Sequence, residues 1–284
     1  MTDFTFIVLN YKTYEMTYRC LSCLLKLNGS FNIIVVDNCG FSKKFEELKS
    51  SFRSIKISFC STGKNLGYSA GNNFGFDYAI NENILGKHTI ILNNDVLIND
   101  LDFLYKLLHA IKRNPGFGCI SPKIIHKATG IIQGPYRKES VMKYVFEGLF
   151  PPIIYFRKAL EQYLRRKIRF DKKVYRTMGC CLILNSKIFK EIGRFDESVF
   201  LGSEEEILAE KLILKNRPYI YCPDFSVLHD HGQSTKLISS NLVNEHFRQS
   251  KLYYFKKYRN AKKLKLSVLS VFLIIRDMLI KVFK

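Results

Sequence analysis

Short apolar runs rich in β-branched residues recur along the N-terminal part of the chain, and such runs are typical of strands buried on both faces of a sheet. They occupy residues 4–10, 33–37, 55–60 and 89–93. Between them, residues 14–27, 41–52, 69–81 and 100–113 place apolar side chains at helical spacing. This alternation of strands and helices predicts an α/β fold with a central, mostly parallel sheet.

A second block of elements lies at residues 178–223. Its pattern predicts a strand at 180–185, a helix at 187–192, a turn with acidic residues, a helix at 204–215 and a strand at 219–222. We therefore expect one domain at residues 1–240, interrupted by a basic, aromatic insertion at 137–176. Residues 241–284 are expected to form a helical tail.

The 284 residues carry a formal net charge of +20, most of it in two segments. Residues 137–176 hold 12 basic and 4 acidic residues, and residues 251–284 hold 10 basic and 1 acidic residue. The rest of the chain is close to neutral. Such an excess of positive charge requires a polyanionic partner, whether nucleic acid, an anionic membrane surface or a phosphorylated substrate.

The character of the two basic segments favours a membrane surface over the other partners. In the C-terminal segment the apolar run 268–275 ends at Arg276 and Asp277. A spanning helix needs about 20 predominantly apolar residues, so we expect a basic amphipathic helix that lies on the membrane. Nucleic-acid binding is disfavoured because none of the common modules is present. A solvated basic surface without a specific partner is the third alternative.

The eight cysteines are interpreted as buried, reduced thiols. Cys20 and Cys23 form a C-x-x-C, but it falls within a helical stretch, and no second pair follows at the spacing of a zinc site. The N-terminus has no basic segment followed by a long apolar stretch, so no signal peptide is expected. A reducing, cytoplasmic setting is therefore expected.

Polar residues follow three of the predicted strands. Asn10 ends the first, Asp37 and Asn38 end the second, and Asn93, Asn94 and Asp95 end the fourth. Ligands of open α/β sheets bind beyond the carboxyl ends of the strands. Carboxylates placed there can accept hydrogen bonds from a base or sugar, or hold a divalent cation that bridges phosphates. Taken singly each residue also fits an ordinary turn, but their recurrence at one edge indicates a site.

A glycine-containing loop, residues 65–73, runs into the third helical stretch. Glycines let a backbone approach a ligand closely, and the free N–H groups of a helix N-terminus favour an anion such as a diphosphate. The loop matches neither the Walker motif nor the Rossmann G-x-G-x-x-G motif, so nucleoside triphosphatases and dehydrogenases lose their usual support.

An ordered set of motifs resembles a known family. The set is Val36-Asp37-Asn38, Asn65-Leu66-Gly67-Tyr68-Ser69-Ala70-Gly71-Asn72-Asn73, Leu92-Asn93-Asn94-Asp95-Val96, Gly179-Cys180-Cys181, Gly193-Arg194-Phe195-Asp196-Glu197, Glu204-Glu205-Glu206 and His229-x-x-Gly232-x-Ser234. Over residues 4–235 the chain resembles family 2 nucleotide-sugar glycosyltransferases, in particular the rhamnosyltransferase-like branch that builds bacterial surface polysaccharides. The resemblance implies a GT-A fold, in which a Rossmann-like nucleotide-binding half is fused to an acceptor-binding half.

The resemblance also implies ligand-binding roles. Asp37 would contact the nucleotide base, and the nucleotide-sugar site would be lined by Asn10, Asn65, Gly67, Gly71, Asn72 and Asn94. Asp95 and His229 would hold Mg²⁺ or Mn²⁺, with His231 as a fallback. Asn93 stands where the family's D-x-D motif has its first acid, so Asp95 is the carboxylate that remains from that motif.

The family's catalytic base lies in a Glu-Asp pair that opens a helix, and Glu204-Glu205 match that pair. Glu205 falls at the Asp position and is the expected base, with Glu204 as its neighbour. Acids in the first turn of a helix also favour its dipole, which is the purely structural alternative. In the catalytic interpretation, the carboxylate removes the acceptor's proton during a single displacement that inverts the anomeric centre.

The predicted function is therefore that of an inverting hexosyltransferase. It would move a sugar from a UDP- or dTDP-sugar to a hydroxyl of a lipid-linked or growing bacterial surface polysaccharide. Its expected place is peripheral, on the cytoplasmic face of the bacterial cell membrane. The alternative is a catalytically weakened nucleotide-sugar-binding or assembly subunit, which Asn93 and the Glu-Glu-Glu stretch allow.

Overall fold

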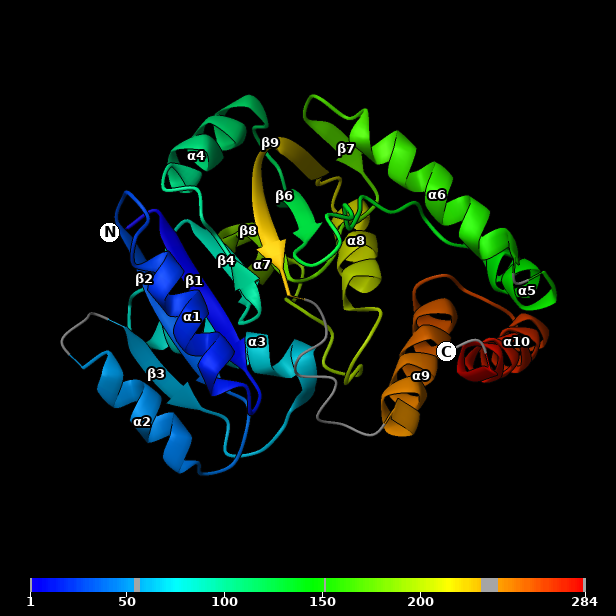
Figure 1. Cartoon of the computed structure of the whole chain (residues 1–284), viewed down its shortest axis with the longest axis horizontal. Coiled ribbons are helices and arrows are strands. Elements are labelled where there is room, and N and C mark those ends of the chain that lie inside the picture. Colours follow the sequence, from blue (N-terminus) through cyan, green and yellow to red (C-terminus); the bar gives the residue numbers. More distant parts are fainter. Residues whose placement is uncertain (1, 54–56, 151, 231–239, 283–284) are drawn as a thin grey trace.

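A nine-stranded sheet forms the centre of the protein (Figure 1). The structure is a computed structural model, and it describes residues 2–53, 57–150, 152–230 and 240–282. Along the sheet the strands follow the order β3-β2-β1-β4-β8-β6-β9-β5, and β7 pairs with β9.

The N-terminal half contains the strands and helices that the apolar pattern predicts. The strands β1 (Phe4–Asn10), β2 (Phe31–Asp37), β3 (Ser58–Ser61) and β4 (His88–Asn93) pair in parallel. Their helices are α1 (Tyr14–Leu24), α2 (Lys43–Ser51), α3 (Gly67–Asn81) and α4 (Phe103–Arg113). Alternate side chains of β1 enter opposite cores, Phe6 on one face and Ile7 on the other, which explains why the run is apolar throughout.

The C-terminal half continues the same sheet. Here β8 (Cys181–Asn185) runs antiparallel to both β4 and β6 (Cys119–His126), and β6 pairs in parallel with β9 (Tyr219–His229). Consequently β6 and β9 point the same way as β1 to β4, and the mostly parallel sheet is confirmed. The short strands β5 (Val96–Leu97) and β7 (Lys172–Val174) pair antiparallel with β9, while α7 (Ser186–Glu191) and α8 (Glu204–Leu214) complete this half.

Strand register brings the polar strand ends together. Asn10 is paired with Asp37 across β1 and β2, and Leu9 with Asn93 across β1 and β4. On the far side of the sheet, β5 pairs Val96 with His229 of β9. Asp95 therefore lies next to His229, although 134 positions separate them in the sequence.

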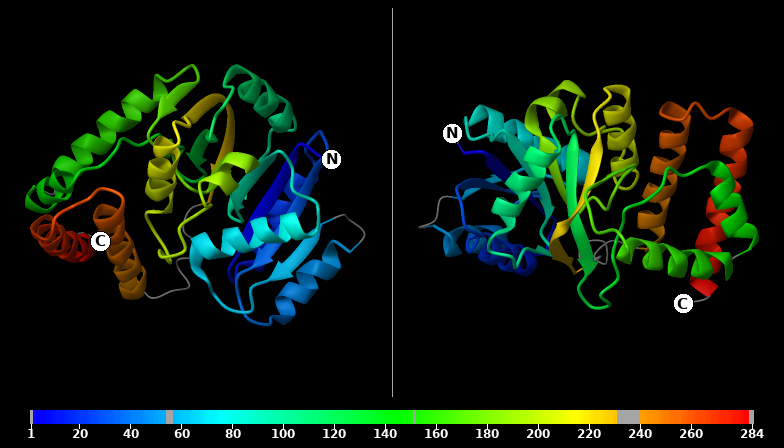
Figure 2. Two further views of the ribbon diagram at one scale, coloured as in Figure 1. Left: turned by 180° about the vertical axis from the view of Figure 1, so that it is seen from behind. Right: turned by 90° about the horizontal axis from the view of Figure 1, so that it is seen from above.

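The two basic segments fold as helices that pack together beside the sheet (Figure 2). They form α5 (Val141–Leu149), α6 (Pro152–Arg166), α9 (Ser240–Lys257) and α10 (Lys263–Val282). A separate core joins α5, α9 and α10 to the body, and its buried members are Tyr144, Val199, Ile207, Tyr254, Phe255, Leu269 and Leu273. Within the described ranges, no helix combines the length and apolar character needed to cross a membrane.

Candidate active site

A buried hydrogen-bonded network fixes the ends of β1, β2 and β4. The amide of Asn10 donates to Asp37 Oδ1 (2.7 Å), and the amide of Asn94 donates to Asn10 Oδ1 (3.1 Å) and Thr13 Oγ1 (2.7 Å). Asp37 is only 1% exposed. Burial raises the pKa of its carboxyl, while hydrogen bonds from Asn10 and Tyr14 oppose the rise. The network therefore holds the ends of these three strands together at one edge of the sheet.

Asn38 holds the glycine-containing loop against this edge of the sheet. Its Oδ1 accepts from the backbone N–H of Leu66 (2.9 Å), and its Nδ2 donates to the Gly67 carbonyl (2.9 Å). Gly67 has a φ of +81°, and a Cβ there would lie 2.3 Å from the carbonyl oxygen of Phe200. Only glycine fits this position, because both the backbone conformation and the contact exclude a side chain.

Further along α3, two of the predicted site residues serve packing. Gly71 faces β1, where an added Cβ would lie 2.8 Å from Leu9 Cδ1. Asn72 is buried; its Nδ2 donates to the Tyr68 carbonyl (2.9 Å), and its Oδ1 accepts no hydrogen bond. These contacts place α3 close to the sheet, with its N-terminus at the loop.

Two adjoining pockets open above the strand ends. The smaller, about 140 Å³, is lined by Asn38, Asn65, Gly67 and Asn94, among others. The larger, a cleft of about 580 Å³, is lined by Asp95, Gly179, Glu204, Glu205 and His229, among others. Tyr68, Asn93 and Leu201 line both. Of the predicted site residues, Asn10, Asp37, Gly71 and Asn72 line neither pocket and lie beneath or behind them.

Asp95 and His229 lie next to each other in the wall of the cleft. His229 Nδ1 lies 2.7 Å from Gln133 Oε1, and with Nδ1 donating to that carbonyl oxygen, Nε2 is the ring nitrogen that faces Asp95. Nε2 is 3.4 Å from Asp95 Oδ1, a buried oxygen that accepts no hydrogen bond. A carboxylate oxygen and an imidazole nitrogen that face each other in this way fit a divalent cation. In the described part of the chain no three His, Cys, Asp or Glu side chains cluster as a metal site, and His231 lies outside it.

The expected catalytic acids begin α8, after Ser203 in a left-handed conformation (φ 66°). Glu205 is half-buried at the cleft, and its Oε1 accepts from the N–H of Gly179 (2.8 Å). Glu204 is buried and accepts from the N–H of Gly202 (2.7 Å). A Cβ on Gly179 would lie 2.6 Å from Glu205 Oε1, so the glycine makes room for this carboxylate.

Burial and mutual repulsion separate the protonation states of these acids. Burial, together with the charge of Glu205, raises the pKa of Glu204 to about 8. Burial also raises the pKa of Glu205, and the Arg176 guanidinium limits that rise. Of the two acids, Glu204 therefore holds a proton more readily at neutral pH, and the Arg176 guanidinium favours the ionised form of Glu205. A carboxylate with a raised pKa is a stronger base than an exposed one.

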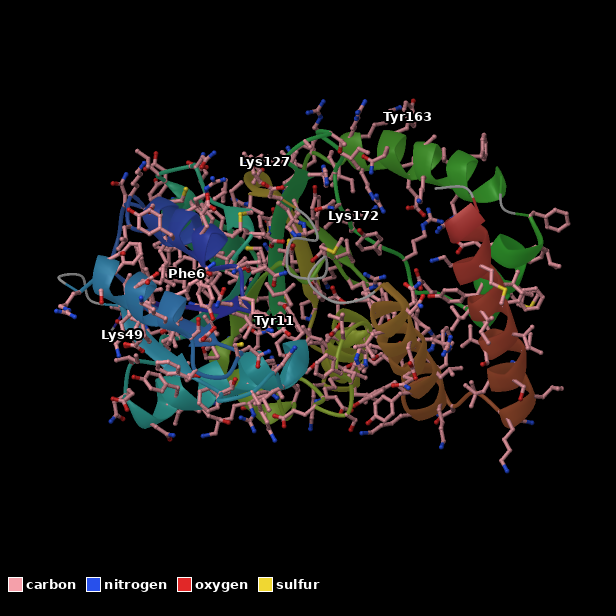
Figure 3. The ribbon with its side chains drawn as sticks, turned by 60° about the horizontal axis from the view of Figure 1, so that its bottom comes forward. Phe6, Tyr11, Lys49, Lys127, Tyr163 and Lys172 are labelled. Carbon is pink, nitrogen blue, oxygen red and sulfur yellow. The ribbon has the colours of Figure 1, made fainter. Side chains whose placement is uncertain are left out.

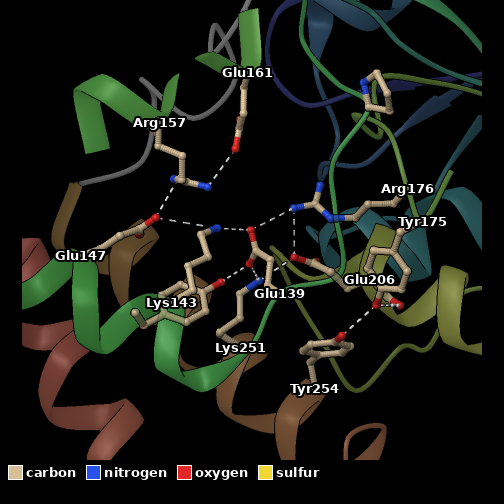
Figure 4. Close-up of polar contacts among 12 residues, drawn as sticks. Glu139, Lys143, Glu147, Arg157, Glu161, Tyr175, Arg176, Glu206, Lys251 and Tyr254 are labelled. Carbon is tan, nitrogen blue, oxygen red and sulfur yellow. Dashed lines mark hydrogen bonds and ion pairs between the residues drawn. The ribbon is translucent and has the colours of Figure 1, made fainter. Parts of the chain in front are cut away.

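Glu206 belongs to a cluster of ion pairs, which Figure 4 shows, and its role is structural. Although burial alone would raise its pKa, ion pairs to Lys251 (2.6 Å) and Arg176 (3.2 Å) hold that pKa below its ordinary value. Both cations also pair with Glu139, which precedes α5. This cluster ties α8, the insertion and α9 together along one wall of the cleft.

Sequence reasoning missed several residues of this site. Gln133, Arg176 and Lys251 come from separate segments and gave no signal, because only the folded chain brings them to the cleft. Tyr68 did carry a signal, since it lies within the quoted loop motif. Its hydroxyl donates to the Gly179 carbonyl (2.6 Å) and joins the loop to the cleft.

The mostly parallel sheet, with pockets at the carboxyl ends of its strands, has the arrangement expected of a GT-A fold. The profile described as "Glycosyl transferase family 2" matches residues 5–193. The chain therefore belongs to glycosyl transferase family 2, and it is a glycosyltransferase.

Similar proteins agree with this assignment. The chain is 26% identical over 250 residues to the low-salt glycan biosynthesis hexosyltransferase Agl10 of Haloferax volcanii, covering 87% of this chain and 74% of that protein. The mannosyltransferase PcManGT of Pyrobaculum calidifontis, solved with GDP-Man and Mn²⁺, aligns over 95% of this chain and 70% of its own, with a TM-score of 0.61 and 12% identity. GalNAc-T7, solved with UDP, GalNAc and Mn²⁺, aligns over 91% of this chain and 49% of its own (TM-score 0.64, 12% identity).

Proposed function

We propose that the protein transfers a sugar from a nucleotide-diphosphate sugar to a hydroxyl of a lipid-linked saccharide, by a single displacement that inverts the anomeric carbon. One observation carries the proposal: the Asp95–His229 pair and Glu205 line one cleft, and this cleft adjoins the pocket formed by the glycine-containing loop. If a donor spans both pockets, its sugar–phosphate bond lies between the Asp95–His229 pair and the Glu205 carboxylate.

We assign the nucleotide to the smaller pocket. Asn65, Gly67 and Asn94 line it, and the N-terminus of α3 begins at Gly67. A helix N-terminus favours the negative charge of a diphosphate. Contact between Asp37 and the base stays a prediction, because this carboxylate is buried, lines neither pocket and accepts hydrogen bonds from Asn10 and Tyr14.

Asp95 and His229 would hold Mg²⁺ or Mn²⁺. The cation supplies a Lewis acid that stabilises the charge left on the nucleoside diphosphate. Two observations support this assignment: the facing Nε2 and Oδ1 atoms, and the Mn²⁺ present in two solved structures of the same fold.

Glu205 is proposed as the base. As the acceptor oxygen attacks the anomeric carbon, its proton passes to the Glu205 carboxylate, and the bond from sugar to phosphate breaks toward the diphosphate. The Gly179 N–H holds the carboxylate in place, and protonated Glu204 avoids a second charge beside it.

The acceptor would enter through the outer part of the cleft. Beyond Glu205 the five basic side chains of the cleft wall, Lys143, Arg157, Lys158, Arg176 and Lys251, outnumber the three acids with which they pair there, Glu139, Glu147 and Glu206. Positive charge at this place suits the phosphate of a lipid-linked saccharide. The rhamnosyltransferase-like branch, a bacterial surface polysaccharide and a place on the cytoplasmic membrane face remain predictions.

A donor-hydrolysis assay with a panel of UDP-, dTDP- and GDP-sugars, with and without Mn²⁺, tests the proposal. We expect hydrolysis of one donor class, stimulated by Mn²⁺, and a loss of that stimulation in Asp95→Asn. Binding of a donor without hydrolysis by the wild-type protein would instead favour the catalytically weakened subunit.

A further inference from the structure

The insertion helix α6 turns its polar side toward the body. Gln162 exchanges two hydrogen bonds with the backbone of Ile132 (2.8 and 3.1 Å). The buried Arg165 donates to the carbonyls of Ile132 and Pro135 (3.2 and 3.3 Å). An ordinary surface helix does the opposite, burying an apolar stripe and exposing its polar side.

The outward side of α6 is correspondingly apolar. Its exposed side chains follow the i, i+4, i+7, i+8 spacing of one helix face: Phe156, Leu160, Tyr163 and Leu164. Phe156 is 74% exposed. Figure 3 shows Tyr163 at the outer edge of the molecule.

The preceding helix repeats this arrangement. Along α5 and its C-cap, the exposed side chains at the same spacing are Met142, Phe146, Leu149 and Phe150. Tyr144 and Glu147 point inward instead and are buried. An ion pair between Glu147 and Arg157 (2.6 Å) joins the two helices. Two consecutive helices therefore expose apolar faces beside each other.

The charge around these faces is positive and largely unneutralised. All four acids of the insertion are paired with Lys or Arg: Glu139, Glu147, Glu161 and Asp171. Around the apolar stripe of α6, Lys158, Arg166, Lys167 and Arg169 are exposed. Lys167 lies over the ring of Tyr163, 4.3 Å from its centroid, so charge and apolar surface are in contact.

We propose that α5 and α6 form a membrane-docking face that lies on an anionic lipid surface. Phe146, Phe156 and Leu160 enter the boundary between headgroups and acyl chains, and Arg166 and Lys167 contact lipid phosphates. Half of the exposed side chains at this spacing are Leu or Met, which suit acyl chains but offer the bases of a nucleic acid no ring for stacking. A second copy of the chain would bring two faces of the same positive charge together.

The C-terminal helix α10 packs against the docking face. α10 buries Leu269 and Leu273 against the core that contains Tyr144 of α5, so its first role is to support the insertion. Leu264, Val271, Ile274 and Met278 of α10 are exposed as well, so membrane contact by the tail stays a prediction beside the docking face of the insertion.

Vesicle co-sedimentation of the full chain tests this proposal. The test variant is Phe156→Gln/Leu160→Gln/Tyr163→Gln, which removes apolar surface, preserves charge and keeps a good helix former. The matched control is Phe41→Gln/Leu214→Gln, two side chains on the body that are 94% and 76% exposed. We expect the wild type and the control to bind vesicles containing phosphatidylglycerol, and the test variant to bind at least tenfold more weakly. Vesicles of phosphatidylcholine alone should bind all three weakly.

The proposal is wrong if the wild type does not bind the anionic vesicles, or if the test variant binds them as tightly as the wild type does. It is also wrong if the three substitutions weaken oligonucleotide binding or dimerisation while the wild type shows no vesicle binding. The assay contains no sugar donor, so its outcome is separate from that of the proposed glycosyl transfer. The three substituted positions do not line the cleft, and donor hydrolysis by the variant should match that of the wild type.

Discussion

Burial of the two glutamates that open α8 sets the expected pH dependence. Glu205 acts as a base only when ionised, and burial raises its pKa. As the pH falls, activity should therefore be lost above pH 4.3, which is about the ordinary pKa of a glutamate. Arg176→Gln removes the positive charge that limits this rise, so the acid limb of the kcat/KM profile should move to higher pH. Arg176→Lys should restore the wild-type limb, and an unmoved limb in Arg176→Gln would contradict the assignment.

Gln133 is expected to matter through His229. Its carbonyl oxygen accepts from Nδ1 and leaves Nε2 as the metal-facing atom. Loss of such a partner typically weakens metal binding by about 10–100-fold. We expect Gln133→Leu to weaken Mn²⁺ binding by that amount, measured by electron paramagnetic resonance with UDP present. The exposed Gln249→Leu is the control, and equal Mn²⁺ affinity in both variants would contradict the assigned tautomer.

At the scale of elements, α3 approaches the sheet closely because glycines face it. A Cβ on Gly75 would lie 2.6 Å from Ile7 Cγ2 and 2.7 Å from Val36 Cγ2. Overpacking of this kind typically costs about 1–3 kcal/mol. Gly75→Ala should lower the free energy of unfolding by that amount, measured by urea denaturation. Gly40→Ala, whose Cβ would meet no atom closer than 3.5 Å, should be close to neutral; similar losses in both would contradict the packing argument.

The N-terminal strands could be predicted because their apolar runs are continuous and end at polar residues. By contrast, β6 was not predicted, and β9 was predicted to end at Cys222 although it continues to His229. Both strands contain a proline, which supplies no backbone donor and usually ends a run. The structure accommodates this by a register shift, in which Pro122 pairs with Cys222 and Lys123 with Ser226.

The strand-end part of the site could likewise be predicted from the sequence, since parallel strands bring their carboxyl ends together. Arg176 and Lys251 could not, because their positions depend on how the insertion and α9 pack on α8. The helices α5 and α6 were also missed. Their exposed apolar faces do not follow the pattern of a soluble helix.

At the scale of the whole molecule, the buried charge cluster joins the C-terminal helices to the body. Lys251→Met leaves Glu206 buried with one partner fewer, and breaking such a pair costs about 3–5 kcal/mol. Lys256→Met, an exposed position on the same helix, should cost little. Urea denaturation of both variants at neutral pH measures the difference.

The same cluster gives a pH dependence of stability. The cations around Glu206 and Glu139 hold both pKa values below the ordinary value despite burial. Groups of this kind stabilise the fold above their unfolded-state pKa, about 4.3, and that stability is lost as the pH falls further. The penalty of Lys251→Met should therefore shrink in acid; a penalty that is constant from pH 7 to pH 3 would contradict the ion-pair account.

Glu205 is proposed to take the acceptor's proton during glycosyl transfer. The most direct measurement compares turnover of the preferred nucleotide sugar by the wild type, Glu205→Gln and Glu191→Gln, an exposed glutamate used as control. Calorimetric titration with the donor's nucleoside diphosphate reports binding. We expect Glu205→Gln to bind normally and to lose about 10²–10⁴-fold in turnover, while Glu191→Gln keeps both. Normal turnover by Glu205→Gln would contradict the account.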